Sequence, residues 1–183
     1  EIDKLWQMVE QSLAMVGVRS AAPRGNTDQI EIGSFLGELC ENYYSECSAK
    51  CLKLDYIQGD KLFVKADSQA LSSIFSNIIT NAIKYNKPNS KISVQYNVDN
   101  KKRKLIVSIS DTGIGIKRTE VSEVFKPFFR AETATNSGVP GSGIGLALVK
   151  AQVDKLGGKV KIKSTVNVGT NVTIILPVDY DKE

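Results

Sequence analysis

Three polar side chains on one predicted helix are the first candidates for chemistry. Asn77, Asn81 and Lys84 stand at positions i, i+4 and i+7 of the segment 67–86, so a helix places them on one face. The neighbouring face is apolar, and Asp67 is a plausible N-cap in front of it. Standing alone, the three residues fit an ordinary solvated surface. Their significance depends on two glycine motifs further along the chain.

The first motif follows a predicted strand and contains a carboxylate. Asp111 opens the sequence Asp-Thr-Gly-Ile-Gly, and a buried carboxylate at a strand end can accept hydrogen bonds from the exocyclic amine of a ligand. Gly113 and Gly115 permit the backbone to approach such a ligand closely. An aspartate that merely caps a turn is the structural alternative.

The second motif is Gly-Ser-Gly-Ile-Gly-Leu at positions 141–146, which leads into a predicted helix. Helix starts offer free N–H groups and the positive end of the helix dipole, which suit phosphate groups. A dinucleotide-binding fold also uses glycines in this way, but it requires a strand directly before them. Here an irregular segment, residues 116–140, stands in that place.

Taken together and in this order, these stretches resemble the N, G1 and G2 boxes of the catalytic and ATP-binding domain of sensor histidine kinases. Residues 125–130, Phe-Lys-Pro-Phe-Phe-Arg, resemble the F box, and Gly169-Thr170 resembles the last glycine box. That domain shares its superfamily with Hsp90, gyrase and MutL. The resemblance covers residues 30–178, and four boxes in the right order are far more specific than one glycine motif.

The resemblance implies a role for each box in binding ATP and Mg²⁺. It makes Asp111 the partner of the adenine amino group, with Thr170 nearby, and Asn81 the magnesium ligand. Lys84 contacts phosphate, Tyr85 contacts the nucleotide, and Arg130 neutralises the γ-phosphate, although a plain surface arginine is the alternative. The further candidate ATP-binding residues are Gly113, Gly115, Ile116, Phe128, Gly141, Ser142, Gly143, Ile144, Gly145 and Leu146. The segment 116–140 corresponds to the ATP lid, which the F-box phenylalanines are expected to anchor by burial.

Asn77 favours phosphoryl transfer over hydrolysis. Hydrolysing relatives carry a glutamate at the equivalent position, and an amide cannot take a proton as a general base. The chain contains no histidine, so it cannot hold the phosphoacceptor of a histidine kinase. We expect that acceptor on a dimerisation hairpin upstream, with a response regulator receiver domain as the next partner and a homodimer in the full-length protein. A regulatory nucleotide-binding module, an anti-sigma-type serine kinase and an ATPase are the competing functions.

Composition restricts the class of protein only mildly. Hydrophobic residues make up 42% and charged residues 24% of 183 residues, with a net charge of +4 that is too small to indicate nucleic acid. The basic run 101–104 fits a solvated hairpin turn. Three cysteines at 40, 47 and 51 fit small buried thiols better than a metal site, because no histidine completes one. The sequence starts inside a helical pattern, which we interpret as a fragment of a longer protein, on the cytoplasmic side if that protein is anchored in a membrane.

The remaining patterns predict an α+β fold. Residues 1–18 would form the end of the hairpin helix, 19–28 a linker, 29–178 the catalytic domain and 179–183 a tail. Within the domain we expect a strand at 29–32, helices at 33–50, 67–86 and 143–156, and hairpins joining 52–56 to 62–66, 92–96 to 105–109, and 160–162 to 172–176. These elements suit a two-layer α/β sandwich of the Bergerat type, a mixed, mainly antiparallel sheet with three helices on one face.

Overall fold

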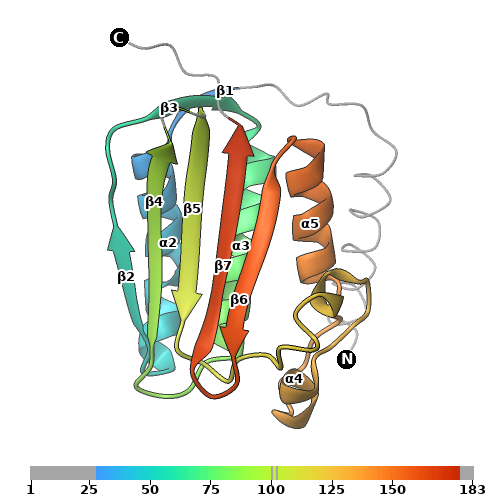
Figure 1. The fold of residues 1–183 in the computed structure, drawn as a ribbon. Helices are drawn as coiled ribbons and strands as arrows, with labels where there is room; N and C mark the ends of the chain where they lie inside the picture. The colour runs from blue at the N-terminus through green and yellow to red at the C-terminus, as the bar shows by residue number, and fades with distance from the viewer. Residues whose placement is uncertain (1–27, 100, 102, 178–183) are drawn as a thin grey trace.

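A five-stranded sheet with helices on one face forms the body of the molecule (Figure 1). The computed structural model describes residues 28–99, 101 and 103–177, so the predicted hairpin helix, linker and tail at 1–18, 19–28 and 179–183 lie wholly or almost wholly outside the described residues. The elements are β1 (Asp28–Glu31), α2 (Ile32–Ala49), β2 (Lys53–Ile57), β3 (Phe63–Ala66), α3 (Ser68–Lys84), β4 (Lys91–Asp99), β5 (Lys104–Asp111), the 3₁₀ turn η1 (Glu123–Phe125), α4 (Glu132–Asn136), α5 (Gly145–Lys155), β6 (Lys159–Thr165) and β7 (Gly169–Pro177).

The sheet has the order β2-β4-β5-β7-β6, with β2 parallel to β4 and every other pair antiparallel. Helices α2, α3 and α5 cover the same face (Figure 1). The predicted α+β architecture is therefore confirmed, as are the hairpins β4–β5 and β6–β7. The register sets Asp111 opposite Thr170, and Thr170 opposite Ser164. Three neighbouring strands thus bring these side chains to one end of the sheet.

The predicted hairpin between 52–56 and 62–66 is wrong. β2 pairs in parallel with β4, whereas β3 pairs with β1 in a separate two-stranded sheet. The chain between β2 and β3 does not form a hairpin turn, because hydrogen bonds attach it to β4 and to the start of α2. Tyr96 donates its hydroxyl hydrogen to the carbonyl of Asp60 (2.7 Å), and the Ile32 amide donates to the carbonyl of Leu62 (2.9 Å). The expected strand at 29–32 ends one residue early, since Ile32 begins α2.

The core lies between the helices and the inner face of the sheet. Inward apolar residues of β4, β5 and β7 alternate with outward residues that are polar except for Ile106 and Ile175, as is typical of a sheet covered on one face. Helix α3 is the central contact of this layer, and its buried residues are Leu71, Ile74, Phe75, Ile78, Ile79, Ala82 and Ile83. Cys40 and Cys47 are buried as expected, but Cys51 is exposed. Cys51 follows the end of α2 and has a φ of 54°, so it does not share the inward face of that helix.

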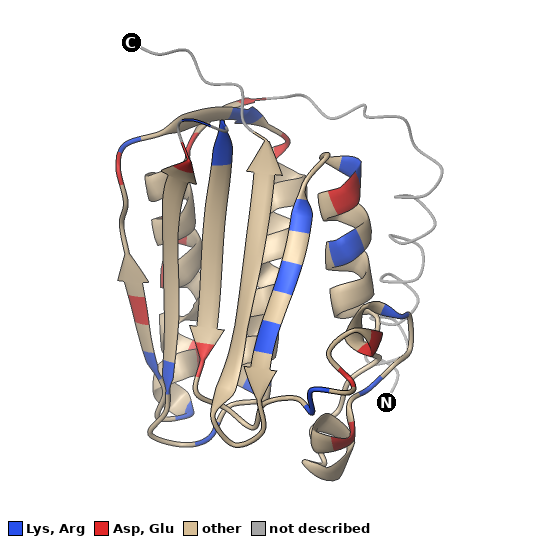
Figure 2. Cartoon of the chain, in the orientation of Figure 1, with Lys and Arg blue, Asp and Glu red and all other residues tan. Residues whose placement is uncertain are grey.

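The outer face of the sheet is mainly polar, with Ile57, Ile106 and Ile175 as apolar exceptions, and carries lysines along one edge. Lys159, Lys161 and Lys163 repeat at every second residue of β6 and are exposed (Figure 2). Because β6 is an edge strand, these charges discourage pairing with another chain. Towards the centre of that face, the Asn171 amide donates to the hydroxyl of Ser108 (2.8 Å).

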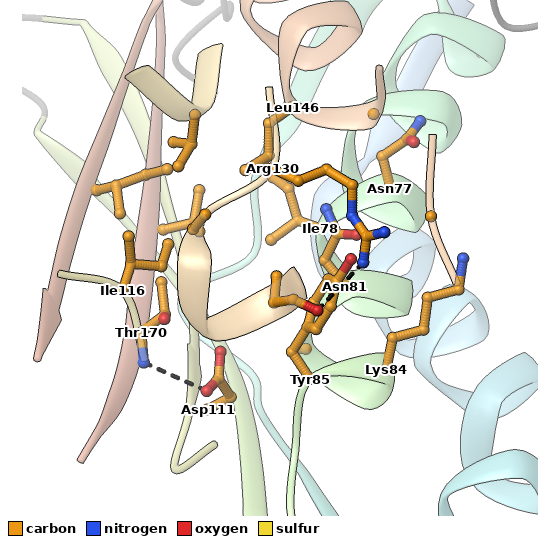
Figure 3. A pocket seen from close by; sticks show the side chains of 18 of the residues that line it. Asn77, Ile78, Asn81, Lys84, Tyr85, Asp111, Ile116, Arg130, Leu146 and Thr170 are labelled. Carbon is orange, nitrogen blue, oxygen red and sulfur yellow. Dashed lines mark hydrogen bonds between the residues drawn. The ribbon is translucent and has the colours of Figure 1, made fainter. Parts of the chain in front are cut away.

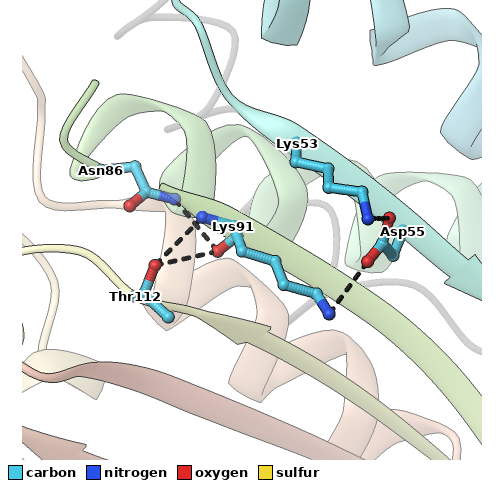
Figure 4. A network of polar contacts seen from close by, with 5 residues as sticks. All are labelled: Lys53, Asp55, Asn86, Lys91 and Thr112. Carbon is cyan, nitrogen blue, oxygen red and sulfur yellow. Dashed lines mark hydrogen bonds and ion pairs between the residues drawn. The ribbon is translucent and has the colours of Figure 1, made fainter. Parts of the chain in front are cut away.

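A polar network joins the end of α3 to the strand ends beside it (Figure 4). The Lys91 amide donates to the Thr112 hydroxyl (3.0 Å), and the Asn86 side-chain amide reaches the carbonyl of Lys91 (3.5 Å). On β2, Asp55 forms ion pairs with Lys91 (2.9 Å) and Lys53 (3.3 Å). The network fixes the chain that follows Asp111 against the start of β4.

We predict that Asp67→Ala destabilises the domain by about 1 kcal/mol. One oxygen of Asp67 accepts hydrogen bonds from the amides of Gln69 (2.9 Å) and Ala70 (3.1 Å), which are orphan donors at the start of α3. Urea unfolding of both proteins measures the difference. Asp67→Asn is the matched control, because an amide oxygen caps as well as a carboxylate. Equal losses in the two variants would contradict a capping role.

Candidate functional site

A pocket opens between α3, the sheet end formed by β5 and β7, the start of α5 and the segment 116–140 (Figure 3). It is built from polar groups at its two ends and apolar side chains between them. The residues that line it are Asn77, Ile78, Thr80, Asn81, Ala82, Lys84, Tyr85, Ile109, Asp111, Ile114, Gly115, Ile116, Val124, Phe129, Arg130, Ala131, Thr133, Ala134, Gly141, Ser142, Gly143, Gly145, Leu146, Ile162, Thr170 and Val172.

Helix α3 supplies one wall, and its helical spacing turns Asn77, Asn81 and Lys84 to the same side. Asn77 donates its side-chain amide hydrogen to the carbonyl of Ser73 one turn earlier (2.8 Å). The half-buried side chain of Asn81 makes no hydrogen bond to residues 28–99, 101 or 103–177, so its oxygen is available to a ligand. Lys84 is exposed at the rim.

The start of α5 supplies the opposite wall. The helix begins at Gly145, and within residues 28–99, 101 and 103–177 no side chain caps it, so its first N–H groups can receive an anion. Gly145 lies against α3, since a Cβ atom there would sit 3.0 Å from the side-chain oxygen of Asn77. The two helices therefore meet at this end of the pocket, where α5 offers backbone N–H groups and α3 offers the side-chain amides of Asn77 and Asn81.

Asp111 forms the other end of the pocket. The amides of Gly113 (2.8 Å) and Thr170 (3.2 Å) both donate to its Oδ1, and the second oxygen points into the pocket (Figure 3). Burial raises the pKa of the Asp111 carboxyl to about 6, although the two backbone hydrogen bonds act in the opposite direction. The carboxylate is thus ionised at neutral pH but poorly solvated, which makes it a strong acceptor for a donor on a ligand.

Three glycines let the backbone close around Asp111. A Cβ atom at Gly113 would lie 2.3 Å from the carbonyl oxygen of Tyr85. At Gly115 and Gly169, where φ is +67° and +136°, it would lie 2.0 Å from the carbonyl oxygens of Thr165 and Asp111. That Gly113 and Gly115 allow close approach to a ligand stays a prediction, and of the two only Gly115 lines the pocket. In the ligand-free domain both glycines closely approach the protein's own backbone, which helps to place the carboxylate.

The segment 116–140 folds over the pocket as an irregular chain with η1 and α4. Arg130 enters the pocket and donates from Nη2 to the carbonyls of Val139 (2.6 Å) and Ala134 (3.1 Å). Its buried Nε has no hydrogen-bond partner among the described residues. The Thr133 hydroxyl donates to the carbonyl of Gly115 (2.7 Å). Arg130 therefore holds the segment together while one of its donors stays unmatched.

Most of the predicted site residues meet in this pocket, and three do not. Gly113 is buried beneath it, and Ile144 is only 1% exposed and packs in the interior. Phe128 is 67% exposed, outside the lining, with a φ of 65°. Its amide donates to the carbonyl of Gly143 (3.0 Å), which joins the F box to the G2 glycines. The expectation that the F-box phenylalanines anchor the lid by burial is therefore wrong for Phe128, while its neighbour Phe129 lines the pocket.

The sequence reasoning missed the apolar middle of the pocket. The missed residues lie side by side across β5, β7 and β6, and they are Ile109, Val172 and Ile162. Each is two residues along its strand from Asp111, Thr170 or Ser164. The signal was available, because residues two apart on a strand share a face. Ile109 therefore had to face the same side as Asp111, and Val172 the same side as Thr170.

Residues 66–180 match the family model described as histidine kinase-, DNA gyrase B-, and HSP90-like ATPase. The chain belongs to this family. The resemblance drawn from its boxes is thereby confirmed. In the described residues, no helix combines the length and apolar character needed to cross a membrane.

Bacterial sensor proteins are among the relatives of this chain. The chain is 26% identical over 183 residues to the sensor histidine kinase WalK of Bacillus subtilis, covering 100% of this chain and 30% of that protein. It is 37% identical over 113 residues to the sensor protein RprX of Bacteroides fragilis, covering 62% of this chain and 22% of that protein. The chain thus spans less than a third of the length of these relatives.

Solved structures of histidine kinases share the fold. The mycobacterial sensor histidine kinase MprB superposes with a TM-score of 0.71 at 27% identity, over 82% of this chain and 98% of that one. Full-length ShkA, solved in complex with AMPPNP, gives a TM-score of 0.88 at 21% identity over 99% of this chain and 37% of that one. At that identity the second match concerns the fold alone.

The raised pKa of Asp111 predicts that Asp111→Asn stabilises the ligand-free domain at neutral pH. An asparagine oxygen still accepts from Gly113 and Thr170, but no charge is desolvated. The carboxyl binds a proton more tightly in the folded state than in the unfolded one, so it favours folding below pH 4 and loses that contribution as pH rises to about 6. The difference between 3.8 and about 6 corresponds to at most about 3 kcal/mol.

Urea unfolding of both proteins at pH 4 and pH 7.5 measures this effect. The variant's advantage should appear at pH 7.5 and shrink towards pH 4. Asp154→Asn, at an exposed position of α5, is the control and should show no such gain. An advantage of the same size at both pH values would rule out desolvation of Asp111 as its origin.

Proposed function

We propose that this domain binds Mg-ATP and transfers the γ-phosphoryl group to a histidine on the dimerisation hairpin of the same protein. The proposal depends on one observation: a single pocket has a hydrogen-bond acceptor at one end and groups that can bind an anion at the other. A buried acceptor, Asp111, stands at one end, and the free start of α5 faces the amides and ammonium of α3 at the other. An adenine nucleotide has the matching polarity, with amine donors at one end and phosphates at the other.

The base end of the pocket suits adenine. The free oxygen of Asp111 accepts a hydrogen bond from the exocyclic amino group, with Thr170 beside it. The purine ring occupies the apolar middle, between Ile109 and Leu146. Tyr85 and Ile116 close the pocket on the nucleotide's flanks.

The phosphate end suits a triphosphate with a magnesium ion. The glycine amides at 141–145 and the ammonium of Lys84 face the phosphate oxygens. Mg²⁺ takes oxygen ligands and keeps several waters, so the free side-chain oxygen of Asn81 is a fitting protein ligand. Bound there, the ion would offset charge on the phosphates. Arg130 would reach the γ-phosphate after exchanging its lid carbonyls for phosphate oxygens.

Asn77 distinguishes transfer from hydrolysis. Its amide hydrogen is already engaged by the Ser73 carbonyl, and neither of its side-chain atoms can act as a base. The domain therefore positions ATP without activating water, and transfer depends on positioning and electrostatics. The acceptor histidine and the group that removes its proton must come from outside this chain, which contains no histidine.

Relatives indicate the partners. WalK is a sensor histidine kinase, and the structure of ThkA was solved in complex with the response regulator protein TrrA. By analogy we place residues 29–178 as the catalytic domain on the cytoplasmic side, 1–18 as the end of the dimerisation hairpin, 19–28 as the linker and 179–183 as a tail. The full-length protein would be a homodimer that passes the phosphoryl group to a receiver domain.

Incubation with γ-labelled Mg-ATP tests the function. This chain and a longer version that restores the upstream hairpin are compared, and acid-labile label on protein is counted against free phosphate. We expect label on the longer protein alone. ATP binding without label on either protein would favour a regulatory nucleotide-binding module, and steady release of free phosphate would favour an ATPase.

We predict that Asn81→Ala lowers phosphoryl transfer by the longer protein at least about a hundredfold, because the ion loses its protein ligand. Binding of ATP in the presence of EDTA should change by less than about threefold, since that measurement contains no magnesium contact. Asn42→Ala, on the exposed face of α2, is the matched control and should leave both quantities unchanged. Full transfer by Asn81→Ala would remove the magnesium role from this residue.

A further inference from the structure

One hydroxyl outside the pocket connects its base end to the start of the lid. Ser164 lies on β6 and does not line the pocket. Its oxygen accepts a hydrogen bond from the Ile116 amide (2.9 Å), contacts the Thr170 hydroxyl (2.8 Å) and donates to the carbonyl of Gly169 (2.9 Å). We propose that Ser164 is a positioning residue that orients the Thr170 hydroxyl and so helps the site select a 6-aminopurine nucleotide. This inference rests on the proposed binding of ATP.

The three contacts determine where the protons lie. A serine hydroxyl has one hydrogen to donate and two lone pairs that accept. The carbonyl of Gly169 can only accept, and the amide of Ile116 can only donate. Ser164 therefore gives its hydrogen to Gly169, and the remaining lone pair must accept the hydrogen of Thr170. The one donor and both acceptor positions of the Ser164 hydroxyl are then used.

This arrangement makes Thr170 an acceptor towards the pocket. With its own hydrogen directed at Ser164, the Thr170 oxygen presents only lone pairs to a ligand. The Thr170 amide is already committed to Asp111 (3.2 Å), whose second oxygen is also an acceptor when ionised. The polar groups at the base end thus both seek donors. An exocyclic amine satisfies them, whereas a carbonyl at the same ring position leaves acceptors facing an acceptor.

The same hydroxyl fixes the first residue of the lid. Ile116 lines the pocket and its amide is held by Ser164, while the preceding Gly115 packs against the backbone of Thr165, the next residue of β6. Base recognition and the root of the lid therefore share one hydrogen-bond centre. Loss of the Ser164 hydroxyl would free Thr170 to rotate its hydrogen into the pocket and would leave the Ile116 amide without this partner.

The test compares ATP with inosine triphosphate, which differs by a carbonyl in place of the amine. Dissociation constants of both nucleotides are measured by calorimetry for the wild-type chain, Ser164→Ala, Thr170→Val and the double variant. The ratio of the two constants is the readout, because a general loss of folded protein changes both affinities alike. Thr165→Ala is the matched control, since its exposed side chain lies on the outer face of the same strand.

We expect Ser164→Ala to weaken ATP binding about five- to tenfold, the size of one lost hydrogen bond, and inosine triphosphate binding much less. Preference for ATP should then fall by a similar factor. The double variant should resemble Thr170→Val alone, because Ser164 acts through Thr170. Thr165→Ala should keep the wild-type ratio. In the ligand-free protein, hydrogen exchange at the Ile116 amide should accelerate in Ser164→Ala and in the double variant, but not in Thr170→Val or Thr165→Ala.

Two results would overturn the inference. One is a Ser164→Ala ratio within twofold of the wild type, whatever happens to stability. The other is an additive effect in the double variant, which would separate Ser164 from Thr170. Failure of the proposed ATP binding looks different, because the wild-type chain itself would then bind neither nucleotide, and failure of phosphoryl transfer alone would leave the ratio of the two constants measurable. The hydrogen-exchange measurement reports on the Ser164–Ile116 bond in that case as well.

Discussion

The buried carboxylate of Asp111 is the constraint on which the rest of the structure depends. Desolvation raises its pKa to about 6 in the ligand-free domain, so the charge at neutral pH opposes folding. The protein offsets this with two amides on one oxygen, which requires the chain on both sides of the carboxylate to come very close. Gly113 and Gly169 make that possible, because any side chain there would collide with the backbone of Tyr85 or of Asp111 itself. The second oxygen is left to the pocket.

The strands around Asp111 hold its carboxylate and the residues next to it in place. β5 delivers the carboxylate, β7 delivers Thr170 in register with it, and β6 delivers Ser164 behind Thr170. Thr112 bonds to Lys91 and so fixes the chain after Asp111 to β4 (Figure 4). The end of α3 takes part too, since the Tyr85 carbonyl accepts the amide of Ile114 (3.0 Å). A cluster of short, local contacts therefore fixes both ends of the pocket relative to each other.

A feature could be predicted from the sequence when residues close by in the chain determine it, and could not when distant residues do. Helix α3, Ser68–Lys84, matches the predicted helix 67–86 to within two residues at each end, because its apolar spacing and its Asp67 cap are local features of the sequence. The hairpin at 52–66 failed, since the pairing of β2 with β4 and of β3 with β1 is decided by distant strands. The glycine boxes were located correctly, but the sequence does not say which atoms approach a glycine. Ser164 gave no signal, because a serine on an alternating strand is ordinary until its three partners are known.

If the pocket binds ATP as proposed, the side-chain amide of Asn77 accounts for why it would not hydrolyse the nucleotide. Its amide hydrogen is directed at the Ser73 carbonyl, and its oxygen faces the backbone of Gly145. The side chain thus joins α3 to the start of α5, where the proposed phosphates would lie, and offers them no base. Hydrolysis would require a group in this position that takes a proton from water. Under the proposed function, the γ-phosphoryl group would therefore wait for a nucleophile that brings its own base, and control over the reaction would lie with the domain that presents the acceptor.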